Sequence, residues 1–232
     1  MPGISEALRG IKYPGRGIIL GKSADSRAVV VAYFLTGRSE NSKNRVLEAD
    51  GRGIRTSIFD ESREVDPSLI IYAPVRICGN MMIVTNGRQT DTVCEYIRNG
   101  DSYDEALREW SFEPDAPIYT PRISGVIDLA DGAYRLSLIK ADGANCLRFF
   151  FEYGASGASG RLIHTYAGDV DPPGPFCGEP VPVDIPADID EFTDAVWGSL
   201  DETYRVSLFT RYIDLKTKNH ETRIINSNRR EP

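Results

Sequence analysis

The sequence predicts an α+β protein made of packed layers. β-branched and aromatic runs typical of strands recur along the chain, whereas few segments have the periodicity of an amphipathic helix. These strands and helices occur in groups and do not strictly alternate, which favours an α+β arrangement over a parallel α/β one. No internal repeat or sharp change of composition divides the 232 residues, so we expect one domain over residues 1–232.

The N-terminal half begins with a predicted hairpin. Strand-forming runs at residues 15–22 and 27–37 flank the sequence Ser-Ala-Asp-Ser, which is a turn signal. A polar stretch at 38–53 separates this hairpin from the next strands. Further strands are expected at residues 54–59, 69–78 and 81–85, and residues 1–11 are expected to form an N-terminal extension.

Two helices are expected after these strands. The first starts at Thr90 and carries its apolar residues at helical spacing. The second starts at Ser102, where the Ser-x-x-Glu pattern completed by Glu105 is a capping box. A third helix, over residues 188–200, is expected much later in the chain.

The C-terminal half again consists mostly of strands. They are expected at residues 122–129, 134–140, 147–153, 162–166 and 205–215. The segment 168–186 holds six of the 14 prolines and is predicted to be a long ordered loop. The Asn- and Arg-rich residues 219–232 are predicted to fray.

The composition restricts the possible partners. The net charge is −7 and the pI is near 5.0, so the chain has no overall attraction for nucleic acid or for an anionic membrane. Any anion that it binds must meet a local cluster of Arg or Lys. No apolar run approaches the ~18 residues of a membrane span, and the first residues lack the apolar core of a signal peptide. We therefore expect a cytoplasmic protein.

Metal and disulfide chemistry is not expected. Cys78, Cys94, Cys146 and Cys177 are widely spaced and form no C-x-x-C motif, which favours free thiols over disulfides or a metal site. The chain has two histidines and no P-loop, G-x-G-x-x-G or H-E-x-x-H motif. We expect no cofactor and no metal, and an activity that survives chelation.

A basic loop follows the second predicted strand. Residues 37–46 bring Arg38, Lys43, Asn44 and Arg45 close together. An arginine fork suits a phosphate or a carboxylate because it donates two parallel hydrogen bonds. A solvated basic loop without a ligand would have the same spacing, so the loop is a candidate anion site and no more.

Two further polar features lie near the predicted strands at 69–78 and 81–85. Tyr72 lies within an apolar run, where it is either a core tyrosine with a satisfied hydroxyl or a functional group. In the corner that follows, Asn86 and Thr90 could serve as turn and helix cap alone. N–H groups at a helix start nevertheless favour an anion or a polar ligand.

The segment 112–122 places acidic residues between prolines. Glu113 and Asp115 precede Thr120 and Arg122, and the prolines would hold a carboxylate in a defined place. An active-site base requires such placement. The alternative is an acid on a surface loop.

Taken in order, the motifs resemble the archaeal-type IMP cyclohydrolase family. They are YPGRGIILG at 13–21, GRSENSKNR at 37–45, IIYAPVRI at 70–77, VTNGRQTDTV at 84–93 and TPRISGVI at 120–127. Later motifs, HTYAGD and YRVSLFTRYID, resemble the longer bacterial branch of that family. The resemblance implies a four-layered αββα sandwich resembling N-terminal-nucleophile hydrolases, without the N-terminal nucleophile. It also implies a homo-oligomer, expected to be a tetramer.

The resemblance further implies a reaction of purine biosynthesis. In it, 5-formamidoimidazole-4-carboxamide ribonucleotide closes its second ring and becomes inosine monophosphate. The carboxamide nitrogen attacks the neighbouring formyl carbon, and water leaves. This chemistry needs proton transfer, donors for the formyl oxygen, and cations or N–H groups for the ribose phosphate. It requires no redox cofactor.

Matched motif by motif, the resemblance assigns Arg45, Tyr72 and Glu113 to catalysis. Asp115 is the rival carboxylate, because the loop leading to Thr-Pro-Arg is one residue longer here. The residues implied to bind the nucleotide are Arg38, Asn44, Asn86, Asp91, Thr120 and Arg122, with Arg16 as a weaker candidate. Which arginine meets the phosphate is left open.

Two other functions remain as alternatives. A non-catalytic purine-nucleotide-binding or regulatory protein would keep the pocket without turnover. An amidohydrolase with an N-terminal nucleophile would share the architecture, but it needs Cys, Ser or Thr at the mature N-terminus. This chain begins Met-Pro-Gly, with no such residue exposed by obvious processing.

Overall fold

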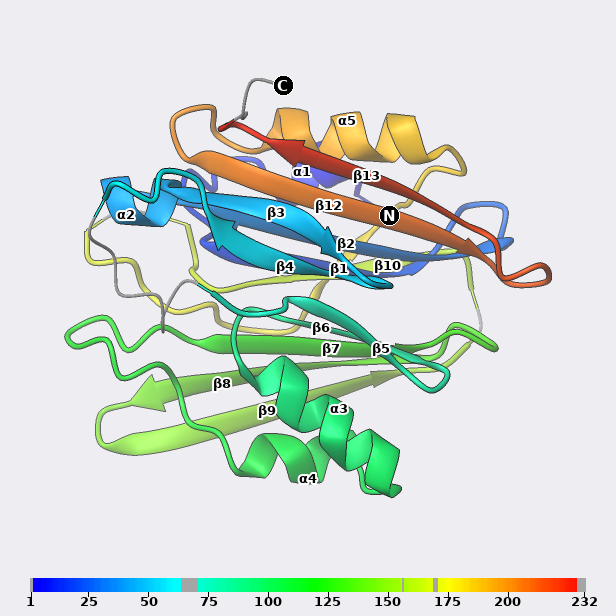
Figure 1. Ribbon diagram of the computed structural model, residues 1–232, viewed down its shortest axis with the longest axis horizontal. Helices are drawn as coiled ribbons and strands as arrows, with labels where there is room; N and C mark the ends of the chain where they lie inside the picture. The colour runs from blue at the N-terminus through cyan, green and yellow to red at the C-terminus, as the bar shows by residue number, and fades with distance from the viewer. Residues whose placement is uncertain (1, 64–70, 156, 169–170, 229–232) are drawn as a thin grey trace.

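Two antiparallel sheets form the centre of the protein (Figure 1). The computed structural model describes residues 2–63, 71–155, 157–168 and 171–228. In this part of the chain, the first sheet has six strands in the order β11-β10-β1-β2-β12-β13. The second has seven strands in the order β3-β4-β5-β6-β7-β8-β9. The prediction of an α+β fold is confirmed.

The strands come from both halves of the sequence. Those of the first sheet are β1 (Arg16–Lys22), β2 (Ala28–Thr36), β10 (Gly160–His164), β11 (Val181–Val183), β12 (Arg205–Asp214) and β13 (His220–Asn226). Those of the second sheet are β3 (Arg45–Asp50), β4 (Gly53–Ile58), β5 (Val75–Cys78), β6 (Met81–Thr85), β7 (Arg122–Asp128), β8 (Tyr134–Asp142) and β9 (Asn145–Tyr153).

Four of the helices lie on the outer faces of the two sheets (Figure 1). Helices α1 (Ile4–Ala7) and α5 (Ile189–Ser199) pack on the first sheet, and α3 (Gln89–Asn99) and α4 (Tyr103–Arg108) pack on the second. The short α2 (Glu40–Lys43) connects β2 to β3. The order of layers is therefore helix, sheet, sheet, helix. No helix within the described residues is long and apolar enough to span a membrane.

Strand β2 explains how this layering follows from sequence. Successive side chains of a strand point to opposite faces. Val31 and Tyr33 lie in the core between the sheets, whereas Ala32 and Phe34 lie in the core under α5. Because both faces are covered, the strand is a continuous apolar run and not an alternating one.

Several local predictions are confirmed. The capping box at the start of α4 is present: the Glu105 N–H donates to Ser102 Oγ at 3.2 Å, and the Ser102 N–H donates to Glu105 Oε2 at 3.0 Å. The hairpin of β1 and β2 forms with the register Arg16↔Leu35 to Lys22↔Val29. The apolar face of α5 is buried.

Three predicted loops contain regular structure instead. The polar stretch at 38–53 includes α2 and β3, and the Pro-rich segment at 168–186 includes β11. The predicted frayed tail at 219–232 includes β13, which pairs with β12. These strands lie at sheet edges, where half-exposed positions tolerate polar residues, so their sequences lack the apolar signal of a central strand. The predicted strand at 69–78 forms from Val75 on, and its residues 69 and 70 lie outside the described residues.

Asn226 joins the two sheets at their edge. Its Oδ1 accepts a hydrogen bond from the Leu47 N–H at 2.8 Å, and its Nδ2 donates to the Leu47 carbonyl at 3.1 Å. The side chain of a β13 residue therefore pairs with the backbone of β3 as another strand would. This contact ties the C-terminal strand to the segment that follows the basic loop.

The expectation of four free thiols is wrong for one pair. Cys78, at the end of β5, and Cys94, in α3, have Cα atoms 5.7 Å apart and form a disulfide. Both belong to the apolar core between α3 and the second sheet, where the turn from β6 into α3 brings the helix back over β5. Spacing in the sequence could not reveal this approach. Cys146 and Cys177 are free.

Candidate functional site

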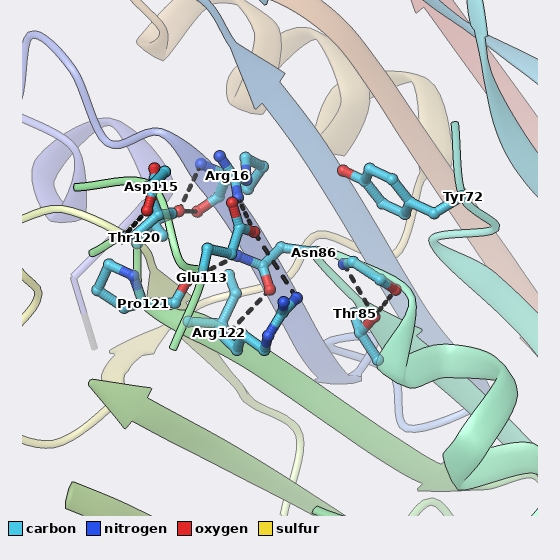
Figure 2. A network of polar contacts seen from close by, with 12 residues as sticks. Arg16, Tyr72, Thr85, Asn86, Glu113, Asp115, Thr120, Pro121 and Arg122 are labelled. Carbon is cyan, nitrogen blue, oxygen red and sulfur yellow. Dashed lines mark hydrogen bonds and ion pairs between the residues drawn. The ribbon is translucent and has the colours of Figure 1, made fainter. Parts of the chain in front are cut away.

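Polar side chains gather where the first strand of one sheet faces the second sheet (Figure 2). Arg16 begins β1, and Arg122 begins β7. The loop between α4 and β7 supplies Glu113 and Asp115, and the segment before β5 supplies Tyr72. Segments that are far apart in the sequence therefore contribute to one cluster.

Glu113 lies between two arginines. Arg16 Nη2 donates to Glu113 Oε1 at 2.6 Å, and Arg122 Nη1 lies 3.8 Å from the same oxygen. The Glu113 N–H donates to the Thr120 carbonyl at 2.9 Å, which fixes the loop. The three side chains are only 12–14% exposed, so their charges interact more strongly than surface charges do. Glu113 therefore shares its negative charge between two guanidinium groups, and Asp115 of the same loop also acts on Arg122.

Arg16 has an unused hydrogen-bond donor. Its Nε is buried and has no hydrogen-bond partner among the described residues. Burial opposes its charge, but Glu113 and the hydroxyls of Tyr72, Tyr166 and Tyr33 outweigh that effect and raise the pKa of Arg16 well above its usual value. Arg16 is therefore a permanent cation with an unused N–H, which suits binding of an oxygen atom.

Arg122 is held more completely by the protein. Its Nε donates to the Ser111 carbonyl at 2.8 Å, and its Nη1 donates to Gln89 Oε1 at 3.1 Å. Its guanidinium carbon lies 4.8 Å from the centroid of the Trp110 ring, within cation–π range. Burial lowers the pKa of Arg122. The fork is thus fixed in orientation next to Glu113.

Asp115 is occupied by Thr120. The Thr120 N–H donates to Asp115 Oδ1 at 2.7 Å, and the Thr120 hydroxyl donates to the other carboxylate oxygen. The Thr120 hydroxyl also lies 2.7 Å from the hydroxyl of Tyr166. Because both oxygens of Asp115 hold the loop, Glu113 is the carboxylate placed against the two arginines.

Tyr72 faces this cluster from the opposite side (Figure 2). Its hydroxyl lies 2.7 Å from the hydroxyl of Tyr33 on β2. Tyr33 is 0% exposed and Tyr72 is 8% exposed, so the pair is buried with Tyr72 nearer to solvent. Burial raises the pKa of Tyr33 well above its usual value, so that hydroxyl keeps its proton at neutral pH.

Arg45 and Asn44 lie at the start of β3 and are both buried. Arg45 Nε donates to the Ser42 carbonyl at 2.8 Å, and its Nη2 donates to the Thr36 carbonyl at 3.4 Å. Asn44 exchanges two hydrogen bonds with the backbone of Asp60, at 2.9 and 2.7 Å. Asn44 therefore holds the loop after β4, while Arg45 is close enough to Tyr33 to lower its pKa against the effect of burial.

The corner between β6 and α3 is held by its own polar side chains. Asn86 Nδ2 donates to the Pro121 carbonyl at 2.8 Å, and Asn86 Oδ1 accepts from the Ile123 N–H and from Gln89 Nε2, both at 3.0 Å. These bonds tie the corner to the start of β7, beside Arg122. The polar side chains of this corner thus hold the start of β7, and with it Arg122, in place.

The hydroxyls of Thr85 and Thr90 close the same corner. They lie 2.7 Å apart, and Thr90 Oγ1 donates to the Gly87 carbonyl at 3.0 Å. Both residues are fully buried. Helix α3 begins at Gln89, one residue before the predicted start, and Thr90 stabilises its first turn from within.

Two of the predicted binding residues contact residues other than Glu113. Asp91 is 67% exposed and pairs with Arg76 at 3.4 Å on the outer side of the second sheet. Arg38 lies 3.5 Å from Asp171, and its guanidinium carbon is 5.0 Å from the centroid of the Tyr13 ring. The side chain of Arg38 is 28% exposed, more than those of the arginines beside Glu113.

Tyr33, Tyr166 and Gln89 belong to the cluster but were not predicted from sequence. Tyr33 lies inside the apolar run AVVVAYFLT, where it resembles an ordinary core residue. Its hydroxyl was the one polar signal in that run before the terminal threonine. Within the described residues, no group of three or more His, Cys, Asp or Glu side chains could hold a metal ion.

The comparisons with known proteins agree with the motif resemblance. A 119-residue stretch, 50% of this chain, is 32% identical to "IMP cyclohydrolase" of Methanothrix thermoacetophila and covers 57% of that protein. A 127-residue stretch is 32% identical to the protein of the same name from Methanococcus maripaludis, covering 53% of this chain and 61% of that one. A 119-residue stretch is 29% identical to the Methanopyrus kandleri "IMP cyclohydrolase" and covers 59% of it.

These matches span less than two thirds of each archaeal relative. The family match is longer. The family described as "IMP cyclohydrolase-like protein" matches residues 13–219, which include every residue of the cluster described above. The chain belongs to the IMP cyclohydrolase-like protein family.

Proposed function

We propose that the chain closes the second ring of 5-formamidoimidazole-4-carboxamide ribonucleotide to give inosine monophosphate. One observation carries the proposal: a carboxylate that is only 14% exposed and lies between two guanidinium groups faces a buried tyrosine pair across the junction of the two sheets. Family membership and the names of the archaeal relatives support it. The further expectations of a homo-oligomer, a cytoplasmic location and a likeness to N-terminal-nucleophile hydrolases are part of the same proposal.

The reaction joins the carboxamide nitrogen to the formyl carbon and expels the formyl oxygen as water. The carboxamide nitrogen adds to the formyl carbon, and a proton moves from that nitrogen to the formyl oxygen. The resulting hydroxyl then leaves as water with the proton of the former formamide nitrogen, which completes the ring. Because both reacting groups are on one imidazole, holding the productive rotamer removes a large part of the barrier.

The residues of the cluster match these requirements. Glu113 would accept hydrogen bonds from the carboxamide nitrogen and keep it facing the formyl carbon, or take its proton. Tyr72 would donate to the formyl oxygen as that atom gathers negative charge. Arg45, which has Nη1 without a partner among the described residues, would stabilise the same charge from the side of Tyr33.

The phosphate needs a separate group of cations. Arg38 is more exposed than Arg16 and Arg122 and lies over Tyr13, so we assign the ribose phosphate to it. Arg122 lies beside Glu113 and is assigned to the reacting end. Asn44, Asn86 and Thr120 make internal hydrogen bonds, and we assign them to positioning the walls of the pocket.

Turnover by the purified chain tests this proposal. We expect the formamido substrate to disappear and inosine monophosphate absorbance to appear faster than in an enzyme-free control. Substrate binding without turnover would instead support the non-catalytic nucleotide-binding protein. Release of formate without ring closure would support an amidohydrolase.

A further inference from the structure

The Tyr33–Tyr72 pair can be satisfied in one proton arrangement only. The two hydroxyl oxygens are 2.7 Å apart, and the distance alone allows either to donate. Among the described residues, each hydroxyl has the other as its hydrogen-bond partner and no further one. The direction of the bond therefore depends on which hydroxyl can donate its own proton to another acceptor.

Burial differs between the two tyrosines. Tyr33 is 0% exposed, whereas Tyr72 is 8% exposed and faces the polar cluster. If Tyr72 donated, the proton of Tyr33 would be buried without an acceptor, which is costly. If Tyr33 donates, its proton is satisfied and the proton of Tyr72 turns toward the ligand.

The effect of the bond on Tyr33 agrees with this direction. The hydrogen bond with Tyr72 adds to burial in raising the pKa of Tyr33, as a bond that Tyr33 donates would. A hydroxyl that accepts such a bond becomes a stronger donor in its turn, which applies here to Tyr72.

We propose that Tyr33 is a positioning residue that donates to Tyr72 and thereby directs the Tyr72 proton at the substrate oxygen that gathers negative charge. This inference rests on the proposed ring closure. Tyr33 acts through Tyr72 and does not touch the substrate. Its effect belongs to the chemical step, because the donated bond strengthens most when charge develops on the substrate oxygen.

The first test compares two buried tyrosines. Tyr33→Phe should lower kcat on the order of tenfold or more and leave KM within about twofold. Tyr103→Phe is the matched control, because Tyr103 is also buried and donates to a hydroxyl, Ser137 Oγ at 2.9 Å, in the core under α4. Tyr103→Phe should lower the melting temperature similarly and keep kcat.

A double variant separates positioning from general destabilisation. In a Tyr72→Phe background the target of Tyr33 is gone, so adding Tyr33→Phe should not lower kcat further. If the two losses multiply, or if Tyr33→Phe alone keeps the parental kcat, the role of Tyr33 is refuted while the ring closure stands. If the parent chain does not exceed the enzyme-free rate, the proposed function fails and this inference fails with it.

Discussion

Replacing Glu113 with Gln separates the charge of this residue from its shape. The variant keeps an oxygen that can accept from Arg16, now 2.6 Å away, but it removes the counter-charge of a buried guanidinium group. Breaking a buried ion pair costs about 3–5 kcal/mol, and a retained hydrogen bond reduces this to about 2–3 kcal/mol. For a chain of this size, the melting temperature should then fall by about 4–12 °C.

The effect on turnover should be larger than the effect on folding. If Glu113 orients or deprotonates the carboxamide, Glu113→Gln should lower kcat on the order of 10²-fold or more at temperatures where the variant is folded. Inosine monophosphate absorbance measures the rate, after the enzyme-free rate is subtracted. Calorimetry on the same samples measures the melting temperature.

Asp115→Asn is the matched control for this experiment. Asp115 lies in the same loop, but both of its oxygens hold Thr120, so its replacement should loosen the loop and affect kcat much less. A parental kcat in Glu113→Gln, together with lost turnover in Asp115→Asn, would refute our assignment of the carboxylate. Parental rates in both variants would show that neither carboxylate takes part in catalysis.

Three further predictions concern residues around the cluster. Arg38→Ala should raise KM with little change in kcat, because losing a charged hydrogen bond weakens binding by roughly 1.5–3 kcal/mol. Steady-state kinetics with the substrate and with a dephosphorylated analogue measures this loss. Asp91→Asn should leave kcat and KM unchanged in the same assay, because Asp91 pairs with Arg76 on the outer side of the sheet. Burial lowers the pKa of His164 to about 4 from 6.5, so the unfolded chain binds a proton first as the pH falls. The free energy of unfolding should therefore decrease between about pH 6.5 and 4, by up to about 1.4 kcal/mol per pH unit from this group. In urea unfolding, the His164→Gln variant should show a weaker dependence of this free energy on pH.

The central strands and the helix starts could be predicted because local rules decide them. The run around Tyr33 and the capping box at Ser102 specify strand and helix without help from the rest of the chain. β13 could not be predicted in this way. Its residues are half-exposed and polar, and its pairing depends on β12 and on the contact of Asn226 with Leu47.

The sequence pointed to several residues of the cluster but not to how they are arranged. The motifs pointed to Glu113 and Tyr72, and the structure places both at the junction of the sheets, although their roles stay predictions. Asn86 was expected to face the ligand, yet its amide is bonded to the backbone of the neighbouring strand, which depends on tertiary packing. Tyr33 was missed because a buried tyrosine in an apolar strand looks the same in sequence whether or not its hydroxyl acts on a neighbour.

The most direct measurement of the central claim follows the formyl oxygen. The parent chain is given substrate labelled with ¹⁸O in the formyl group. Mass spectrometry then measures the isotope content of the products and the rate of their formation at several enzyme concentrations. Enzyme-dependent ring closure predicts unlabelled inosine monophosphate and labelled water, formed at a rate proportional to enzyme. Labelled formate with an open-ring amine, or a rate equal to that of the enzyme-free control, would contradict the account.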